Sequence, residues 1–174
     1  MSVIRQLPVF PLPDVVFFPR TVLPLHVFET RYRAMVRDAL ATDRTIAVAL
    51  LQPGWEQQYA GSPACFEVAT AGTIEDLETT ADGRYYFKLA GSVRVRLGEV
   101  LRDAPYRLVR AEEIPESPVD ESDPFIRSRK LDLLATQVCL VRELTGNDDP
   151  NLVLDERLAF AAAVNGACAS LPAE

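Results

Sequence analysis

The chain has 174 residues, 48% of them hydrophobic and 25% charged, which is typical of a folded globular protein and excludes a disordered chain. This length suits one compact domain with a small appendage and is short for two full domains. The formal net charge of -7 disfavours nucleic-acid binding, because affinity for polyphosphates comes largely from Lys and Arg.

The N-terminal part is predicted to contain short extended segments, one helix and one buried strand. Residues 7–19 are apolar but interrupted by prolines, which cannot donate to a sheet ladder, so we expect short edge strands. Beginning at Phe28, apolar residues recur at helical spacing, and we predict an amphipathic helix over residues 30–41. Residues 46–51 form a short apolar run that ends at a Pro-Gly pair, which indicates a buried strand.

The middle of the chain is predicted to form strands joined by turns. Residues 66–69 and 73–77 have strand character, and Gly72 between them is a position where we expect a bulge. The Asp-Gly pair at residues 82–83 predicts a hairpin turn, since both residues tolerate positive φ angles.

Beyond this turn, apolar and polar side chains alternate with a period of two. Residues 85–90 and 93–97 have the alternation of half-buried antiparallel strands, and residues 106–114 continue it in part. Short strands separated by frequent turns predict a barrel-like sheet rather than a doubly wound one.

The C-terminal part has a different composition. Residues 115–124 are acidic and proline-bearing, which is typical of a linker, and helical spacing then predicts a helix over residues 125–145 and a second one after residue 148. We therefore predict a β-rich domain over residues 1–114, the linker, and a helical subdomain over residues 125–174.

Residues that could carry out catalysis are few. The single histidine, His26, excludes sites that need two imidazoles, and neither Lys88 nor Lys130 lies in the apolar surroundings that turn an amine into a base. We expect no catalytic residue, no metal and no cofactor. A structural role for His26 is favoured, while a Cys–His–acid triad stays an alternative.

The cysteines and the N-terminus bear on the cellular compartment. Cys65, Cys139 and Cys168 are odd in number and far apart, which favours reduced, buried thiols over a disulfide framework. The first residues do not resemble a secretory signal, and no apolar run approaches the ~18 residues of a membrane helix. We expect a cytoplasmic protein.

Three segments together resemble the N-terminal domain of the Lon protease family: residues 7–19 (LPVFPLPDVVFFP), 23–32 (LPLHVFETRY) and 91–94 (GSVR). The chain is similar to free-standing bacterial members of this family. The resemblance implies an α+β fold, namely a PUA-like pseudobarrel of mainly antiparallel strands with one packed helix, followed by a C-terminal helical hairpin. The family commonly has glycine where this chain has Arg20, so we expect a different local turn.

The resemblance also implies a function. It suggests a non-catalytic module that binds unfolded or exposed polypeptide segments and that could act together with a separate protease or chaperone. The candidate contacts are aromatic: Phe17, Phe18, Trp55 and Tyr59. Phe17 and Phe18 have the alternative of being core residues. One alternative function is a peptide hydrolase with an unrecognised nucleophile. Another is an RNA-binding domain, by analogy with other PUA-like folds, but the negative net charge of the chain disfavours RNA binding. We expect no nucleic-acid or membrane partner, and the oligomeric state stays open.

Overall fold

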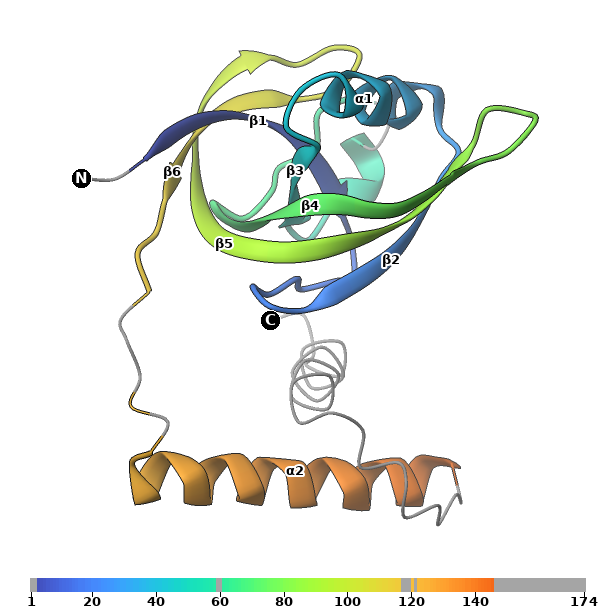
Figure 1. Ribbon diagram of the computed structural model, residues 1–174. Coiled ribbons are helices and arrows are strands. Elements are labelled where there is room, and N and C mark those ends of the chain that lie inside the picture. Colours follow the sequence, from blue (N-terminus) through green and yellow to red (C-terminus); the bar gives the residue numbers. More distant parts are fainter. Residues whose placement is uncertain (1–2, 59–60, 117–119, 121, 146–174) are drawn as a thin grey trace. The chain divides into compact units, whose positions relative to one another are not determined.

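The computed structural model describes residues 3–58, 61–116, 120 and 122–145 (Figure 1). The chain divides into two compact units, the first ending at Pro115 and the second beginning at Glu116. The assignment of residues 115–124 as an exposed linker stays a prediction.

The first unit is a mixed sheet with the strand order β2-β5-β4-β3-β1-β6. Its strands are β1 (Ile4–Leu12), β2 (Val22–Val27), β3 (Thr45–Leu50), β4 (Val68–Thr79), β5 (Tyr85–Arg102) and β6 (Leu108–Glu113). Neighbouring strands pair antiparallel, except that β1 and β3 pair parallel. Because β5 also pairs with β6, the sheet closes on itself, and β2 is attached beside the first half of β5 (Figure 1). The predicted α+β pseudobarrel is confirmed.

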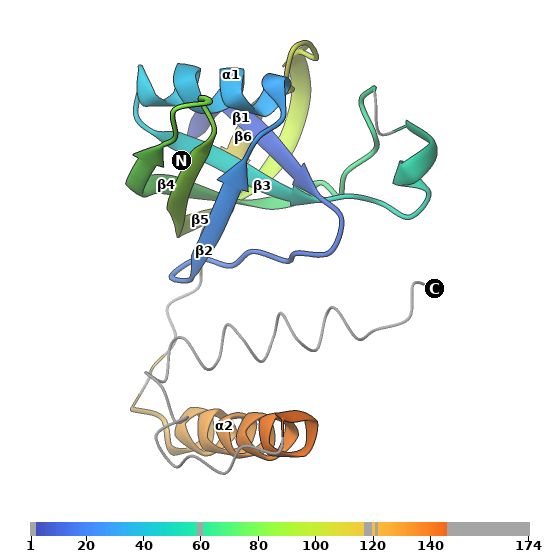
Figure 2. The same ribbon diagram turned by 90° about the vertical axis from the view of Figure 1, so that its right-hand side faces the viewer.

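One α-helix, α1 (Thr30–Leu40), covers the sheet in this unit and agrees with the predicted helix to within one residue. Its buried side chains, Tyr32, Met35, Val36 and Ala39, recur at the three-and-four spacing that puts them on one face. Figures 1 and 2 both place α1 beside β1 and β3. Phe28 does not join this buried face, because it precedes the helix and is exposed.

The interior consists of two hydrophobic clusters that lie on opposite faces of β3. Ile46 and Val48 belong to the cluster that includes the buried side chains of α1. Ala47 and Ala49 belong to a second cluster, which also includes Leu7 of β1 and mainly alanine and valine side chains from β4, β5 and β6. Burial on both faces explains why the β3 sequence is continuously apolar instead of alternating.

The structure corrects the predicted strand boundaries. The two strands predicted on either side of Gly72 are the single strand β4, with a register shift between Ala71 and Gly72 where the bulge was expected. Likewise, the strands predicted before and after Gly91 are the continuous strand β5. A Cβ atom at Gly72 would lie 2.8 Å from the Ala90 carbonyl oxygen, and one at Gly91 would overlap the Phe18 carbonyl oxygen, so only glycine fits at these two positions inside strands.

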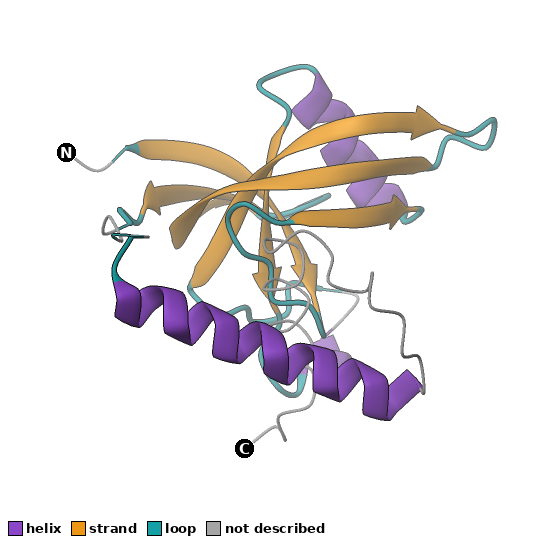
Figure 3. Ribbon diagram, turned by 60° about the horizontal axis from the view of Figure 1, so that its bottom comes forward, coloured by secondary structure: helices purple, strands orange, loops and turns teal. Residues whose placement is uncertain are grey.

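In the second unit, the described structure is the helix α2 (Pro124–Thr145), shown in purple in Figure 3, where a helix was predicted. The predicted second helix of the hairpin lies outside the described residues, as does Cys168. Cys139 is exposed, and the prediction of a buried thiol there is wrong. Helical spacing indicates which side chains share a face, but that face is buried only if another element of the unit covers it.

Candidate functional site

Phe17 is a core residue in the structure. Its side chain is 6% exposed, and its carbonyl accepts a hydrogen bond from Thr70 Oγ1 at 2.6 Å. Gly72 and Gly91 make room for the ring, since a Cβ atom at either position would lie 3.1 Å from a Phe17 ring atom. The ring is therefore not available to a ligand in this structure, in agreement with the core alternative.

Phe18 and Arg20 form the turn that leads into β2. Phe18 is half-buried, and its carbonyl accepts a hydrogen bond from Thr21 Oγ1 at 2.8 Å. Arg20 has φ 65°, in the left-handed region that favours glycine, and its N–H donates to the Gly91 carbonyl at 2.8 Å. A different local turn was expected at Arg20, but its backbone has the conformation that glycine favours although an arginine occupies it.

Trp55 is half-buried at the start of the short 3-10 helix η1 (Trp55–Gln58). Tyr59 lies outside the described residues. The loop that contains Trp55 joins β3 to β4, and it returns to the sheet through an isolated bridge between Leu51 and Cys65.

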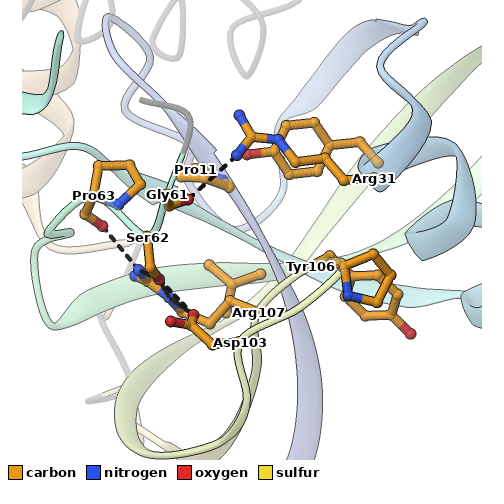
Figure 4. Close-up of a pocket in the computed structure, with 11 residues that line it drawn as sticks. Pro11, Arg31, Gly61, Ser62, Pro63, Asp103, Tyr106 and Arg107 are labelled. Carbon is orange, nitrogen blue, oxygen red and sulfur yellow. Dashed lines mark hydrogen bonds and ion pairs between the residues drawn. The ribbon is translucent and has the colours of Figure 1, made fainter. Parts of the chain in front are cut away.

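Arg107 anchors the end of this loop (Figure 4). Its guanidinium group donates to the Pro63 carbonyl at 2.9 Å and to Ser62 Oγ, and it pairs with Asp103 at 3.3 Å. It also lies 3.3 Å from Cys65 Sγ. Burial raises the pKa of the Cys65 thiol, and the nearby positive charge of Arg107 offsets this rise only in part. The protonated thiol is thus a weak nucleophile.

A small pocket beside Arg107 holds about 30 Å³ and is lined in part by Arg31, Gly61 and Tyr106 (Figure 4). Such a volume accommodates a few water molecules. The polar groups beside it hold the loop, since Arg107 bonds to Ser62 and Pro63 and pairs with Asp103.

A group of exposed rings differs most from the sequence predictions. It consists of His26 on β2, Phe28 just after β2 and Tyr86 on β5, and we call it the aromatic surface. The imidazole of His26 stacks on Tyr86, with ring centroids 4.2 Å apart, and it lies 5.5 Å from the ring of Phe28. Phe28 is 57% exposed and Tyr86 42%. Exposed rings in contact with one another form an apolar patch rather than scattered surface residues.

The register of β2 on β5 creates this surface. His26 pairs directly with Tyr86, and directly opposed side chains in an antiparallel pair lie on the same face. Val22 and Pro24 extend the apolar face along β2, and both are exposed. Beside it, Lys88 on β5 forms an ion pair with Asp76 at 2.9 Å. The face is therefore apolar along β2 and charged toward β4.

None of the three rings was a predicted contact. The alternation of Val22, Pro24, His26 and Phe28 was the available signal, because it places four non-polar or aromatic side chains on one face of an extended segment. The partner ring of Tyr86 depends on the pairing of distant strands and has no local signature.

The described residues provide no catalytic constellation around His26. Within that part of the chain, no hydrogen bond joins His26 to a serine or cysteine, and its ring contacts are aromatic. No group of three potential metal ligands occurs among the same residues. Neither α1 nor α2 has a stretch of the length and hydropathy that crossing a membrane requires.

Comparison with known proteins supports the resemblance noted in the sequence. A family model described as the ATP-dependent protease La (LON) substrate-binding domain matches residues 6–159. Lon protease 2 of Myxococcus xanthus is 30% identical over 118 residues, which cover 68% of this chain and 14% of that protein. Lon protease 2 of Bdellovibrio bacteriovorus is 28% identical over 160 residues, or 90% of this chain and 20% of that protein. The chain thus spans a small part of these relatives.

Two solved structures share the fold. The N-terminal domain of the Mycobacterium avium complex Lon protease has a TM-score of 0.65 and 16% identity, covering 97% of this chain and 86% of that one. The Lon N-terminal domain protein from Xanthomonas campestris has a TM-score of 0.59 and 24% identity, covering 97% and 99%.

Proposed function

The chain belongs to the family of the Lon protease substrate-binding domain, and from this we propose that it is a non-catalytic module that binds unfolded or exposed polypeptide segments. The observation that carries the proposal is the aromatic surface of His26, Phe28 and Tyr86. Apolar side chains that are buried in a folded protein are exposed in an unfolded one, so contiguous rings offer them a place to pack.

The strength of such binding can be estimated from area. An aromatic side chain buries about 150–250 Å² in full, and about half of this area is still accessible in Phe28 and Tyr86. At roughly 25 cal/mol per Å², covering each ring gains about 2 kcal/mol. The entropy lost when the polypeptide associates and becomes ordered offsets much of this free-energy gain. The result is weak binding with little sequence preference. A module that receives many different unfolded chains requires that property.

The loop that contains Trp55 is a second contact in this proposal. Its ring is half-buried, so part of it is accessible, and Arg107 holds the far end of the loop in place. Fixing one end of a loop lowers the entropic cost of ordering its side chains on binding. Phe18 contributes less than Phe28 or Tyr86, because its side chain is half-buried and theirs are exposed.

The two alternative functions have less support. A hydrolase would need a nucleophile activated by a base, whereas Cys65 is hydrogen-bonded to Arg107 and His26 is stacked on Tyr86. An RNA-binding domain would need a continuous basic patch, but exposed arginines such as Arg96 and Arg110 are paired with glutamates. In this account any cleavage of a bound polypeptide is the work of a separate protease.

A direct test compares an unfolded and a folded form of one probe protein. Fluorescently labelled α-lactalbumin that is reduced and carboxymethylated should increase in anisotropy when the chain is added, whereas the native form should not. Equal binding of both forms would argue against recognition of unfolded polypeptide. In parallel, casein incubated with the chain should remain intact, and cleavage that is lost on changing one serine or cysteine would support the hydrolase instead.

A further inference from the structure

The outer edge of β2 carries main-chain groups that the sheet does not use. Among the described residues, β2 pairs with β5 alone. The Gly91 N–H donates a hydrogen bond to the Thr21 carbonyl at 2.8 Å, which shows which residues of β2 face β5 with their main-chain groups. Every second residue then bonds to β5, and the remaining ones direct both N–H and C=O toward the open edge; these are Val22, Pro24 and His26.

Pro24 fits this alternation. It has no N–H, and it stands at a position where the ladder with β5 requires no donor. The open edge therefore offers donors from Val22 and His26 and carbonyl acceptors from all three residues. Equivalent groups along a strand repeat at about 6.8 Å, a spacing that another extended chain matches.

The side chains on both faces of this edge are apolar. Val22, Pro24 and His26 lie on the outer face, which continues into the aromatic surface. Leu23 and Leu25 lie on the opposite face and are half-buried against the main hydrophobic cluster. A strand added beside β2 would place alternate side chains against these two apolar rows, so a suitable strand is apolar on both faces.

We propose that the open edge of β2 accepts an extended, uncharged, apolar segment of an unfolded polypeptide as an additional strand of the sheet. The inference rests on the proposed function and deepens it, because it names the kind of segment and the way it is held. Main-chain hydrogen bonds give affinity for any sequence, and the two apolar rows select segments that form strands in the core of a folded protein.

A second copy of this chain fits the edge less well than such a segment. Two copies would each bring a formal net charge of -7 and repel one another. Antiparallel pairing of β2 with its own copy centred on Pro24 would also oppose two residues that lack an N–H, and would lose both hydrogen bonds of that pair.

The test uses a labelled peptide with a short segment of alternating valine and leucine, flanked by serines and capped at both ends. Two derivatives carry the same number of N-methyl groups. Methylation of alternate residues leaves one edge of the peptide able to pair, whereas methylation of consecutive residues blocks both edges. We expect the first derivative to bind within about threefold of the parent and the second at least about tenfold more weakly. Equal affinities would overturn strand addition.

Matched variants examine the same edge from the protein side. Val22→Pro removes an outward N–H and keeps a side chain of three carbons, whereas Val22→Ala keeps the N–H and removes two methyl groups, so loss of apolar area alone would make the alanine variant the weaker binder. We expect Val22→Pro to bind the peptide about tenfold more weakly than Val22→Ala, with unchanged circular dichroism. Amide hydrogen exchange tests the same edge without a substitution. Bound peptide should slow the exchange of the Val22 and His26 amides and should not change the exchange rates of the Leu23 and Leu25 amides.

The outcomes separate the two proposals. Binding of unfolded α-lactalbumin with no effect of N-methylation and no new amide protection would overturn strand addition and leave the proposed function intact. Absence of any binding of unfolded protein would remove the proposed function itself. A dimer in sedimentation that Val22→Pro dissociates would assign the edge to a second copy and overturn the inference.

Discussion

The imidazole ring of His26 lies parallel to the phenol ring of Tyr86, with centroids 4.2 Å apart and an angle of 4° between the planes. The two residues come from different strands and meet only because β2 pairs with β5 in one register. This contact orders two exposed rings without burying them, which preorganises a surface for an apolar ligand.

The stacked pair predicts how changes at His26 affect binding. His26→Ala should weaken binding of unfolded polypeptide by about 1 kcal/mol, because it removes one ring and leaves the other unsupported. His26→Phe keeps a flat ring and should bind within about twofold of the parent. Fluorescence anisotropy titration measures both, and thermal melts confirm that each variant is folded. If His26→Phe is as weak as His26→Ala, an imidazole-specific contact is responsible instead of ring packing.

A second prediction concerns the loop between β3 and β4. Trp55→Ala removes the largest apolar side chain of this loop and should weaken binding by about 1 to 3 kcal/mol, whereas Trp55→Phe should retain most of the affinity. The fold should persist, because the loop is also held by the bonds of Arg107 to Ser62 and Pro63. Unchanged affinity of Trp55→Ala would remove the loop from the binding surface.

Arg20 predicts a stabilising substitution. Its φ of 65° is costly for any residue with a Cβ atom, so Arg20→Gly should increase the free energy of unfolding by up to about 1 kcal/mol. Arg20→Ala is the control, since alanine meets the same backbone strain and should give no gain. Urea unfolding of the three proteins measures the difference. A destabilised Arg20→Gly would show that the arginine side chain contributes more than the backbone strain costs.

A fourth prediction concerns stability at high pH. Burial raises the pKa of Tyr106, and its hydrogen bond to the Asp38 carboxylate, at 2.7 Å, raises it further. In the unfolded chain this phenol ionises near pH ~10, so its stabilising contribution is complete below that pH and is lost as the pH rises toward the folded pKa.

Tyr106→Phe tests this linkage. Below pH ~9 the variant should be less stable by about 1 kcal/mol, because it lacks the hydrogen bond to Asp38. Above pH ~10 the difference should shrink, since phenylalanine does not ionise and the other tyrosines are common to both proteins. Urea unfolding across this range gives the comparison, and a constant difference at all pH values would contradict the assigned pKa shift.

Much of the fold could be predicted from local pattern. The spacing of Tyr32, Met35 and Ala39 indicated α1, and period-two alternation indicated the barrel-like sheet. Strand lengths were wrong at Gly72 and Gly91, because β4 and β5 each continue through the glycine. In the structure these glycines admit the ring of Phe17 and the Phe18 carbonyl, a contact between distant segments that no local window contains.

The candidate site was less predictable for the same reason. Phe18 and Trp55 were predicted as single aromatic residues in the segments before β2 and after β3, whereas His26 and Tyr86 form a surface only through the pairing of two strands. Cys139 shows the converse error, since helical spacing identified a face of α2 but could not say whether that face is covered.

The central claim is that this chain binds unfolded polypeptide by burying apolar side chains on the aromatic surface. The most direct measurement is a titration of labelled, unfolded α-lactalbumin with the parent chain, Tyr86→Ala and Phe66→Ala, at low and at high salt. Phe66 is a matched control, because its ring is 45% exposed and it precedes β4, whereas Tyr86 pairs near the other end of that strand. We predict that Tyr86→Ala weakens binding by about 1 to 2 kcal/mol, that Phe66→Ala does not, and that salt has little effect. Equal affinity of the two variants, or binding that disappears at high salt, would contradict the account.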